Sequence, residues 1–215
     1  MSGVLVVSGT DTGIGKTVVA AGLAAALEAH YWKPIQAGTQ DGTDSLDAAM
    51  LGVAPDHVLP EAYRLELPAS PHLAAEREAV VIDDDKLALP PVQPLIVEGA
   101  GGLLVPVRRD PPFLMIDLFA RWRAPVLLVA RTQLGTINHS LLSIEALKAR
   151  GIPIAGMIFV GELHADNEAI IPALTGVRNF GRLPHLDPLD ATHLASAVRT
   201  HIDLAGLRAT LEPAR

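Results

Sequence analysis

One short stretch near the amino terminus carries the residue types that bind phosphate. The sequence GTDTGIGKT, Gly9 to Thr17, follows the apolar run VLVVS and precedes an alanine- and leucine-rich segment. A glycine-rich turn between a strand and a helix points backbone N–H groups at phosphate, while the Lys16 ammonium and the Thr17 hydroxyl can reach terminal phosphates and Mg²⁺. The usual pattern G-x-x-x-x-G-K-[ST] needs glycine at position 10, where this chain has Thr10. We interpret the stretch as a nucleotide-binding loop; the alternative is an ordinary strand-to-helix turn with a chance GKT.

A second lysine lies in an unusual context in WKPIQAG, Trp32 to Gly38. A short apolar strand after the first helix would place Lys33 at the carboxyl end of that strand, which is the edge where open α/β sheets bind ligands. A lysine there offers a point charge to a transferring phosphoryl group. The alternative is a surface lysine before a turn-forming proline.

Two acidic residues are candidate metal ligands. Glu98 ends the apolar run of LIVEGAGG and precedes a glycine turn, and a buried acid in that place is costly unless a cation or hydrogen bonds compensate it. Asp44, in DGTDS, can add a second carboxylate from a loop. The alternatives are a glutamate that caps the next turn and an aspartate in an ordinary turn.

The segment QLGTINHSLL contains a candidate helix N-terminus at Gly135, Thr136 and Asn138. Free N–H groups at such a position hold carboxylates or phosphates, but simple capping by Thr136 or Asn138 explains the local sequence better. The histidines are scattered and show no metal-ligand spacing.

The elements that must position these residues alternate along the chain. Continuous apolar runs predict strands buried on both faces, and periodic segments predict helices between them. The predicted strands are Val4 to Ser8, Pro94 to Val97, Pro125 to Ala130 and Ile154 to Val160. The predicted helices are Lys16 to His30, Asn138 to Arg150 and, in a less regular region from Gly38 to Pro91, Ser45 to Leu51 and Ser70 to Glu78. This alternation predicts an α/β, P-loop NTPase-like three-layer fold with a mainly parallel sheet flanked by helices, in a single domain over residues 1–215.

Composition narrows the function classes. The chain has 215 residues, a net charge of −7 and no cysteine. The negative charge argues against a general nucleic-acid or anionic-membrane surface, so we expect neither partner. Without cysteine there is no disulfide, thiolate metal site or cysteine nucleophile, which suits a cytoplasmic location. The first residues have no basic leader, and their apolar run is too short for a signal-peptide core or a membrane span.

Taken together, GTDTGIGKT, WKPIQAG, VEGAGGLLVPV and QLGTINHSLLSIEALKARG resemble the dethiobiotin synthase family, in family order and over most of the chain. In that family the phosphate-binding loop carries an extra residue, so the shifted Gly9 is part of the resemblance. The resemblance implies a homodimeric ATP- and Mg²⁺-dependent cyclo-ligase of biotin biosynthesis, acting on 7,8-diaminononanoate and CO₂. A carbamate would form on one amine, ATP would phosphorylate it, and the second amine would attack that mixed anhydride.

The resemblance also implies site residues at matching positions. Lys16 and Lys33 would be catalytic, and Thr17, Asp44 and Glu98 would surround Mg²⁺. The implied nucleotide-binding residues are Thr12, Gly13, Ile14, Gly15, Lys16, Thr17, Val18, Asp44, Glu98, Gly99, Ala100, Gly101, Val160, Gly161, Leu183, Pro184 and His185. The implied diamine-binding residues are Thr12, Lys33, Ala37, Ser70, Pro71, Gly101, Gly102 and, reaching the neighbouring subunit, Gly135, Thr136 and Asn138.

The chain departs from some family members at four positions. Gly13 stands where they carry an acid, Ala37 where they carry a hydroxyl residue, and Val160 and Gly161 where they place an asparagine that reads adenine. The competing class is a partition or septum-site ATPase with a deviant loop, but such proteins carry a signature lysine where this chain has Asp11. A corrinoid-type amidase ligase would bring a cysteine nucleophile, and a binding module without turnover would not keep both lysines and all three metal ligands.

Overall fold

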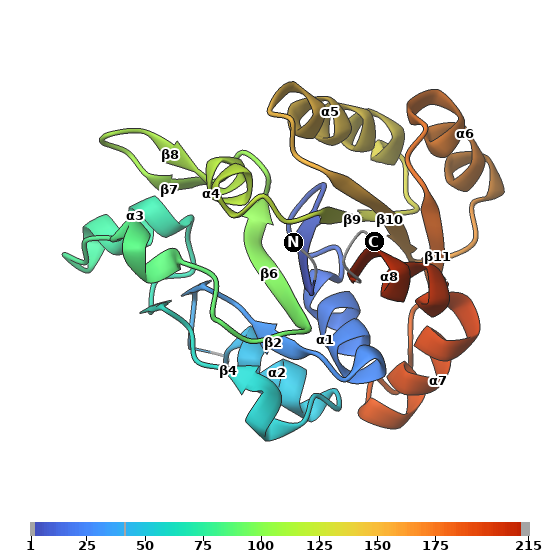
Figure 1. The fold of residues 1–215 in the computed structure, drawn as a ribbon, viewed down its shortest axis with the longest axis horizontal. Coiled ribbons are helices and arrows are strands. Elements are labelled where there is room, and N and C mark those ends of the chain that lie inside the picture. Colours follow the sequence, from blue (N-terminus) through green and yellow to red (C-terminus); the bar gives the residue numbers. More distant parts are fainter. Residues whose placement is uncertain (1–2, 41, 212–215) are drawn as a thin grey trace.

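A seven-stranded parallel sheet forms the centre of the computed structural model, which describes residues 3–40 and 42–211 (Figure 1). The strand order is β11-β10-β9-β1-β6-β2-β4. The strands of this sheet are β1 (Val4–Gly9), β2 (His30–Trp32), β4 (Val58–Leu59), β6 (Leu95–Gly102), β9 (Val126–Arg131), β10 (Ile154–Val160) and β11 (Asn179–Leu183). Two small ribbons add β3 (Ile35–Ala37) with β5 (Tyr63–Leu65), and β7 (Pro106–Arg108) with β8 (Phe113–Leu114).

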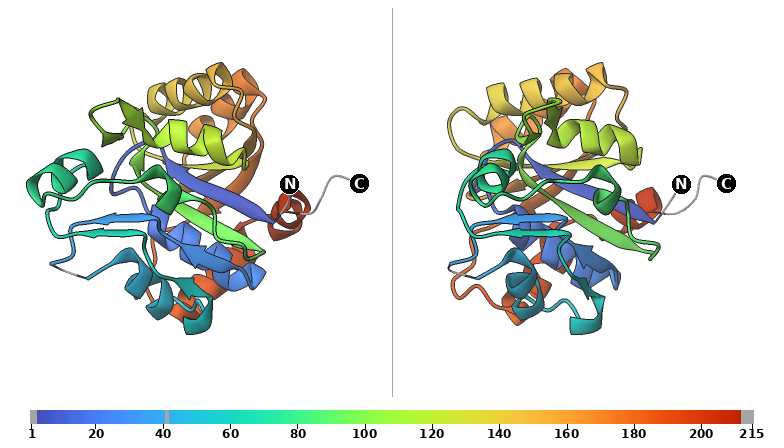
Figure 2. Two further views of the ribbon diagram at one scale, coloured as in Figure 1. Left: turned by 60° about the vertical axis from the view of Figure 1, so that its left-hand side comes forward. Right: turned by 90° about the vertical axis from the view of Figure 1, so that its left-hand side faces the viewer.

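Helices cover both faces of the sheet, so the molecule has three layers (Figures 1 and 2). One face packs against α4 (Met115–Trp122), α5 (Thr136–Ala149) and α6 (Ala165–Thr175). The other packs against α1 (Lys16–Leu27), α2 (Asp44–Met50), α7 (Ala191–His201) and α8 (Leu204–Leu211). The remaining elements are α3 (Pro71–Arg77) and the short 3₁₀ helices η1 (Pro55–His57) and η2 (Asp84–Leu87). This α/β fold confirms the expected class.

The continuous apolar runs are explained by the two cores. Successive side chains of a strand point to opposite faces of the sheet. In β1, Val6 therefore lies in the core under α4 and α5, whereas Leu5 and Val7 lie in the core under α1. All three are fully buried, which explains why Leu5, Val6 and Val7 are apolar on both faces of the strand.

The boundary of the first helix differs from the expectation. The periodic pattern predicts a helix to His30, but α1 ends at Leu27 and Glu28 adopts a left-handed backbone with φ of 53°. The His30 N–H then donates to the Pro94 carbonyl at 2.8 Å and opens β2. A strand partner supplied by distant sequence therefore ends the helix early, which alanine-rich periodicity alone does not reveal. The short strand expected before Lys33 is confirmed as β2.

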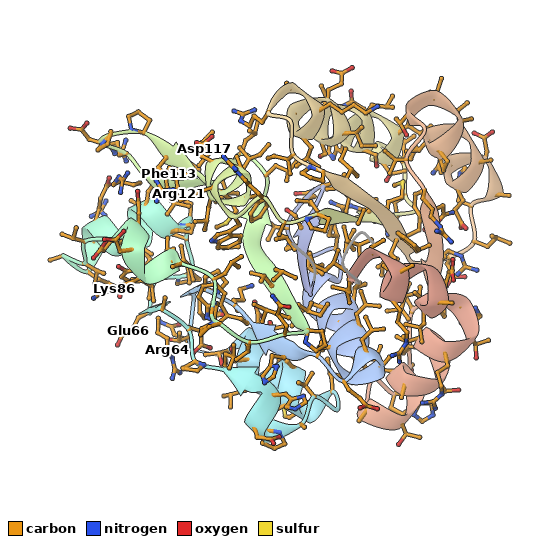
Figure 3. All side chains as sticks on the ribbon, in the orientation of Figure 1. Arg64, Glu66, Lys86, Phe113, Asp117 and Arg121 are labelled. Atoms are coloured by element: carbon orange, nitrogen blue, oxygen red, sulfur yellow. The ribbon has the colours of Figure 1, made fainter. Side chains whose placement is uncertain are left out.

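The α-helices missed by the sequence patterns, α4, α6, α7 and α8, all lie after residue 110. α4 is amphipathic but only eight residues long, and α6 contains Pro172 within its span. Around α4, Arg121 and Phe113 lie together (Figure 3), with the guanidinium carbon 5.0 Å from the ring centroid. Arg121 also donates to Asp84 of η2 at 3.1 Å, which ties the long connection before β6 to α4.

No helix within residues 3–40 and 42–211 combines the length and the apolar character needed to cross a membrane.

Candidate functional site

The loop between β1 and α1 has the geometry of an anion cradle. Gly13 and Gly15 adopt positive φ angles of 67° and 89°, which other residues rarely adopt, and Gly15 is the N-cap of α1. The Lys16 side chain folds back over the loop and donates from Nζ to the Asp11 carbonyl at 3.2 Å. The loop thus presents the amino end of a twelve-residue helix together with a nearly buried ammonium group.

The shifted glycine has a steric reason. A Cβ atom at Gly9 would lie 2.8 Å from the Asp11 carbonyl oxygen and 2.9 Å from Cδ of Lys16. The first loop residues turn back over the end of β1, so only glycine leaves space for the lysine stem. In the usual pattern G-x-x-x-x-G-K-[ST] the first glycine would stand at position 10. In this chain the glycine that opens the loop stands one residue earlier, at Gly9.

The Glu98 carboxylate is the centre of the site, although its residue is only 1% exposed. Its Oε1 accepts hydrogen bonds from Thr17 Oγ1 and Lys33 Nζ, both at 2.9 Å. Its Oε2 accepts from the Tyr31 hydroxyl at 2.7 Å. Lys33 also forms an ion pair with Asp44, the first residue of α2. The three predicted metal ligands are thus brought together: Asp44 and Glu98 pair with the Lys33 ammonium, and Thr17 bonds to Glu98.

Strand register produces this meeting. Tyr31 pairs with Ile96 between β2 and β6, and Val7 of β1 pairs with Glu98. Tyr31 and Lys33 are two residues apart, as are Ile96 and Glu98, so all four side chains belong to the face that α1 covers. α1 starts at the end of β1 on that face and brings its second residue, Thr17, to the same carboxylate.

The prediction that Glu98 ends a strand is wrong. β6 continues through Gly102, and the segment predicted as a glycine turn belongs to the strand. The register against β1 shifts beyond Val7, so Gly9 pairs with Gly102 and three residues of β6 bulge between the two pairs. Gly101 takes the positive φ of 66° in this bulge.

Electrostatics separate the two lysines. Burial lowers the pKa of Lys16, and the Glu98 carboxylate offsets this only in part. Burial also disfavours the charged form of Lys33, but Glu98 and Asp44 outweigh it and raise the pKa of Lys33 above its ordinary value. Lys33 is therefore held as a permanent cation, while Lys16 lacks full compensation and is suited to receive an anionic ligand.

One cavity of about 710 Å³ joins the loop to the Glu98 cluster. It extends from the start of α1 to the amino end of α3. There the Ser70 hydroxyl and His72 Nδ1 share a hydrogen bond of 3.0 Å. The predicted site residues that line it are Thr12, Gly13, Ile14, Gly15, Lys16, Thr17, Val18, Lys33, Ala37, Asp44, Ser70, Pro71, Glu98, Ala100 and Gly101.

A second cavity of about 330 Å³ adjoins the loop on the side of β10 and β11. Val160 pairs with Leu183, and the Gly161 N–H donates to the Leu183 carbonyl at 3.0 Å. The predicted residues that line it are Gly13, Ile14, Gly15, Val18, Val160, Gly161, Leu183, Pro184 and His185. Because three loop residues and Val18 of α1 line both cavities, a ligand can extend from one to the other along the loop.

Five predicted site residues lie outside these two cavities. Gly99 packs against α4, where a Cβ would meet the Phe119 ring at 2.8 Å, so its role here is steric. Gly102 lines a separate hollow of about 330 Å³ beside Asp11. Gly135, Thr136 and Asn138 line another cavity, of about 480 Å³, at the start of α5. Within one chain these three residues do not join the Glu98 cluster.

The donor set around Glu98 suits a hard divalent cation. Two carboxylates and a hydroxyl are oxygen ligands of the kind that Mg²⁺ selects, and Mg²⁺ commonly takes its remaining ligands from phosphate and water. The described residues contain no group of three or more His, Cys, Asp and Glu side chains that could hold a metal by themselves. Thr17, Asp44 and Glu98 therefore fit a Mg²⁺ ion that arrives with a nucleotide.

Two polar residues of the cluster were not among the predicted site residues. Gln36 accepts from the Asp44 N–H at 3.2 Å and donates to the Gly38 carbonyl at 3.1 Å, which fixes the start of α2. Tyr31 donates to Glu98. A usable signal was the alternation HYWK, since Tyr31 shares a face with Lys33 if the segment is a strand. Arg131, paired with Asp11, lines the smaller cavity and gave no sequence signal.

The fold and the loop define a class of nucleotide-binding protein. Residues 3–193 match a family model described as an AAA domain. Two solved structures share the fold. A ParA family ATPase from Chlorobium tepidum superimposes with a TM-score of 0.56 at 12% sequence identity, and the match covers 98% of this chain and 97% of that chain. The septum site-determining protein MinD with Mg-ADP from Pyrococcus horikoshii gives a TM-score of 0.55 at 18% identity, covering 92% of this chain and 86% of that chain. The chain is thus an α/β protein of the P-loop class.

Sequence relatives define the family within that class. The ATP-dependent dethiobiotin synthetase BioD of Novosphingobium aromaticivorans is 59% identical over 89% of this chain and 93% of the relative. The protein of the same name from Afipia carboxidovorans is 55% identical over 97% of this chain and all of the relative. The chain belongs to the ATP-dependent dethiobiotin synthetase family, and it is an ATP-dependent ligase. This confirms the resemblance and excludes the partition-ATPase alternative.

Proposed function

We propose that this protein closes the ureido ring of dethiobiotin in biotin biosynthesis, from 7,8-diaminononanoate, CO₂ and ATP with Mg²⁺, releasing ADP and phosphate. The observation that carries the proposal is the single cavity in which the phosphate-binding loop faces Lys33, Asp44 and Glu98. A nucleotide phosphate and a second, carboxylate-like group can be held side by side there. The cavity continues to Ser70 and Pro71, which leaves space for an aliphatic diamine chain.

The reaction balances in three steps. One amine of the diamine adds to CO₂ and loses a proton, which gives a carbamate. A carbamate oxygen attacks the terminal phosphorus of ATP, the bond to the bridging oxygen breaks, and ADP leaves. The second amine attacks the carbonyl carbon of the resulting mixed anhydride, and phosphate and a proton leave as the ring closes. Holding both amines in one cavity makes the last step intramolecular, which favours it strongly.

The residues of the cavity divide this work. The N–H groups of residues 13–18 and the Lys16 ammonium bind the phosphates, and Lys33 neutralises charge on the carbamate and the transferring phosphoryl group. Thr17, Asp44 and Glu98 hold Mg²⁺, which when bound supplies positive charge to the phosphate oxygens. Since the pKa of Lys33 is raised, Lys33 acts as a fixed cation and not as a base.

The nucleotide base lies, in this proposal, in the smaller cavity at the carboxyl ends of β10 and β11. Val160 and Leu183 offer apolar contacts, and the backbone of residues 160–161 and 183–185 offers the polar groups. Gly161 suits a close backbone approach, because a Cβ there would meet Thr132 Oγ1 at 2.8 Å.

A homodimer completes the diamine site in the proposal. Thr136 is 3% exposed and its Oγ1 has no hydrogen-bond partner, at the N-terminus of a fourteen-residue helix whose neighbour Leu134 is fully exposed. We assign this helix start to the carboxylate of the diamine bound in the other subunit. Mixing Lys33→Met protein with Asn138→Ala protein should then restore about a quarter of wild-type activity, because half of the dimers are mixed and each has one intact site. Activity no higher than that of the separate variants would refute shared sites.

The central test is direct. Purified protein incubated with 7,8-diaminononanoate, bicarbonate, Mg²⁺ and ATP should give dethiobiotin and phosphate in equal amounts. ATP hydrolysis without the ring product would exclude the proposed reaction.

A further inference from the structure

Among the described residues that bond to the Glu98 carboxylate, Tyr31 is the one that does not line the large cavity. Its side chain is fully buried in the core between the sheet and α1, and its hydroxyl donates to Glu98 Oε2 at 2.7 Å. Thr17 and Lys33 line the cavity, whereas Tyr31 reaches the carboxylate from the protein interior.

The two carboxylate oxygens of Glu98 therefore have separate hydrogen-bond partners. Oε1 accepts from both Thr17 and Lys33, on the cavity side. Among the described residues, Oε2 accepts only from Tyr31. The terminal torsion of a glutamate has broad, roughly two-fold minima, so hydrogen bonds and packing decide its orientation. Without the phenol, Oε2 would be a buried, unpaired acceptor, and the carboxylate would gain by turning toward the remaining donors.

The phenol is also a dependable donor. An ordinary phenol keeps its proton at neutral pH, so the hydroxyl is available to donate. The hydrogen bond is charge-assisted and short, as expected for a phenol and a carboxylate in a low-dielectric interior.

We propose that Tyr31 is a positioning residue for metal-nucleotide binding: it holds Glu98 Oε2 from the core and so keeps Oε1 aimed at Thr17 and Lys33. This inference rests on the proposed role of Glu98 as a Mg²⁺ ligand. It predicts that removing one buried hydroxyl affects the protein's response to Mg²⁺, not only its stability.

Tyr31→Phe removes the donor and keeps the ring. The matched control is Tyr63→Phe, since Tyr63 is also buried and its hydroxyl accepts from the Asp83 N–H at 2.6 Å, outside both cavities. Calorimetry should compare binding of the β,γ-imido analogue of ATP with Mg²⁺ and with EDTA. Placing 4-aminophenylalanine at position 31 tests rescue, because it returns an N–H donor to the same ring. If Tyr31→Phe does not fold, 4-fluorophenylalanine at that position fills the hydroxyl volume without donating.

We expect Tyr31→Phe to lose about tenfold in affinity for the analogue with Mg²⁺, equivalent to about 1.4 kcal/mol, and to keep its affinity in EDTA. Tyr63→Phe should keep both affinities, and the amino variant should recover most of the loss. An equal loss with and without Mg²⁺, or affinities within about twofold of wild type, would overturn the positioning role. The calorimetric result is independent of turnover, so failure of wild-type protein to make dethiobiotin would refute the proposed reaction and not this inference.

Discussion

Replacing Lys33 with methionine tests the centre of the site, because it removes a charge and keeps most of the side-chain volume. Lys33 has 7% of its side-chain surface exposed, and it pairs with Glu98, 1% exposed, and Asp44, 26% exposed. Removing one partner of a buried ion pair costs about 3–5 kcal/mol, and we expect about 3 kcal/mol here because Asp44 retains contact with water and Glu98 keeps two other donors. In a protein of this size that lowers Tm by about 6–12 °C.

The kcat of Lys33→Met should fall by more than the variant's loss of folding stability can explain. If Lys33 stabilises developing charge on the carbamate and the phosphoryl group, its loss lowers kcat by about 10²–10³-fold, as for other preorganised donors. The measurements are dethiobiotin formation at saturating substrates, below the Tm of the variant, and thermal unfolding. Lys148→Met is the matched control: Lys148 is exposed on α5 and its ammonium donates to the Thr175 carbonyl at the surface, so its replacement should change neither quantity.

A double variant separates the two effects. In Lys33→Met with Glu98→Gln, the carboxylate that lost its partner is itself neutral, so about half or more of the lost stability should return while turnover stays low. If stability does not recover, the ion-pair account of the cluster is wrong. If Lys33→Met alone keeps near-normal kcat, the catalytic role of Lys33 has to be withdrawn.

Further predictions concern pH, the second lysine and the loop glycine. Because folding raises the pKa of Lys33, the charged side chain contributes its full stability below the ordinary lysine pKa of 10.5, and this contribution is lost only as pH rises through the higher pKa of the folded state. The difference in unfolding free energy between wild type and Lys33→Met should therefore stay constant from about pH 6 to 9. A decline of that difference within this range would contradict the assignment. Since burial lowers the pKa of Lys16, the charge of this lysine destabilises the protein when no nucleotide is bound. Lys16→Met should therefore raise the Tm of the ligand-free protein by about 2–4 °C for each kcal/mol regained, and should weaken ATP binding, measured by calorimetry, at least about tenfold. A Tm below that of wild type would refute this explanation. Gly9→Ala should weaken ATP binding at least about tenfold, because the added Cβ would collide with the loop. The control is Gly176→Ala, at a position with a φ of 71° and open space around it, which should cost about 1–2 kcal/mol of stability and leave ATP affinity unchanged. Equal losses of ATP affinity in the two variants would exclude the steric explanation.

Local sequence was sufficient where chain neighbours supply the physics. β10 has the bounds its apolar run predicts, and α2 and α3 each lie within one residue of the expected ends. The loop glycines at 13 and 15 could be assigned because positive φ is a local backbone requirement that glycine meets at little cost. The class of fold followed from the same kind of signal, since continuous apolar runs alternating with helical periodicity leave few other arrangements.

The predictions that failed depend on partners far along the chain. α1 ends early because His30 pairs with a carbonyl 64 positions later, at Pro94, and β6 runs past Glu98 because β1 continues to support it. No window of sequence around either position contains that information. The same holds for the small ribbons and for the late helices, whose ends are set by packing and not by periodicity.

By itself, then, the sequence determined a phosphate-binding loop with a displaced glycine, a lysine and two acids suited to nucleotide chemistry, and a family resemblance that sequence relatives bear out. Only the tertiary structure decided that Glu98 would be shared among Thr17, Lys33 and the core residue Tyr31. It also decided that Gly9 is required by the stem of Lys16. The reason is physical: the orientation of a buried carboxylate and the ligand it can bind depend on donors within about 3 Å, and in a parallel sheet those donors come from strands that are distant in sequence.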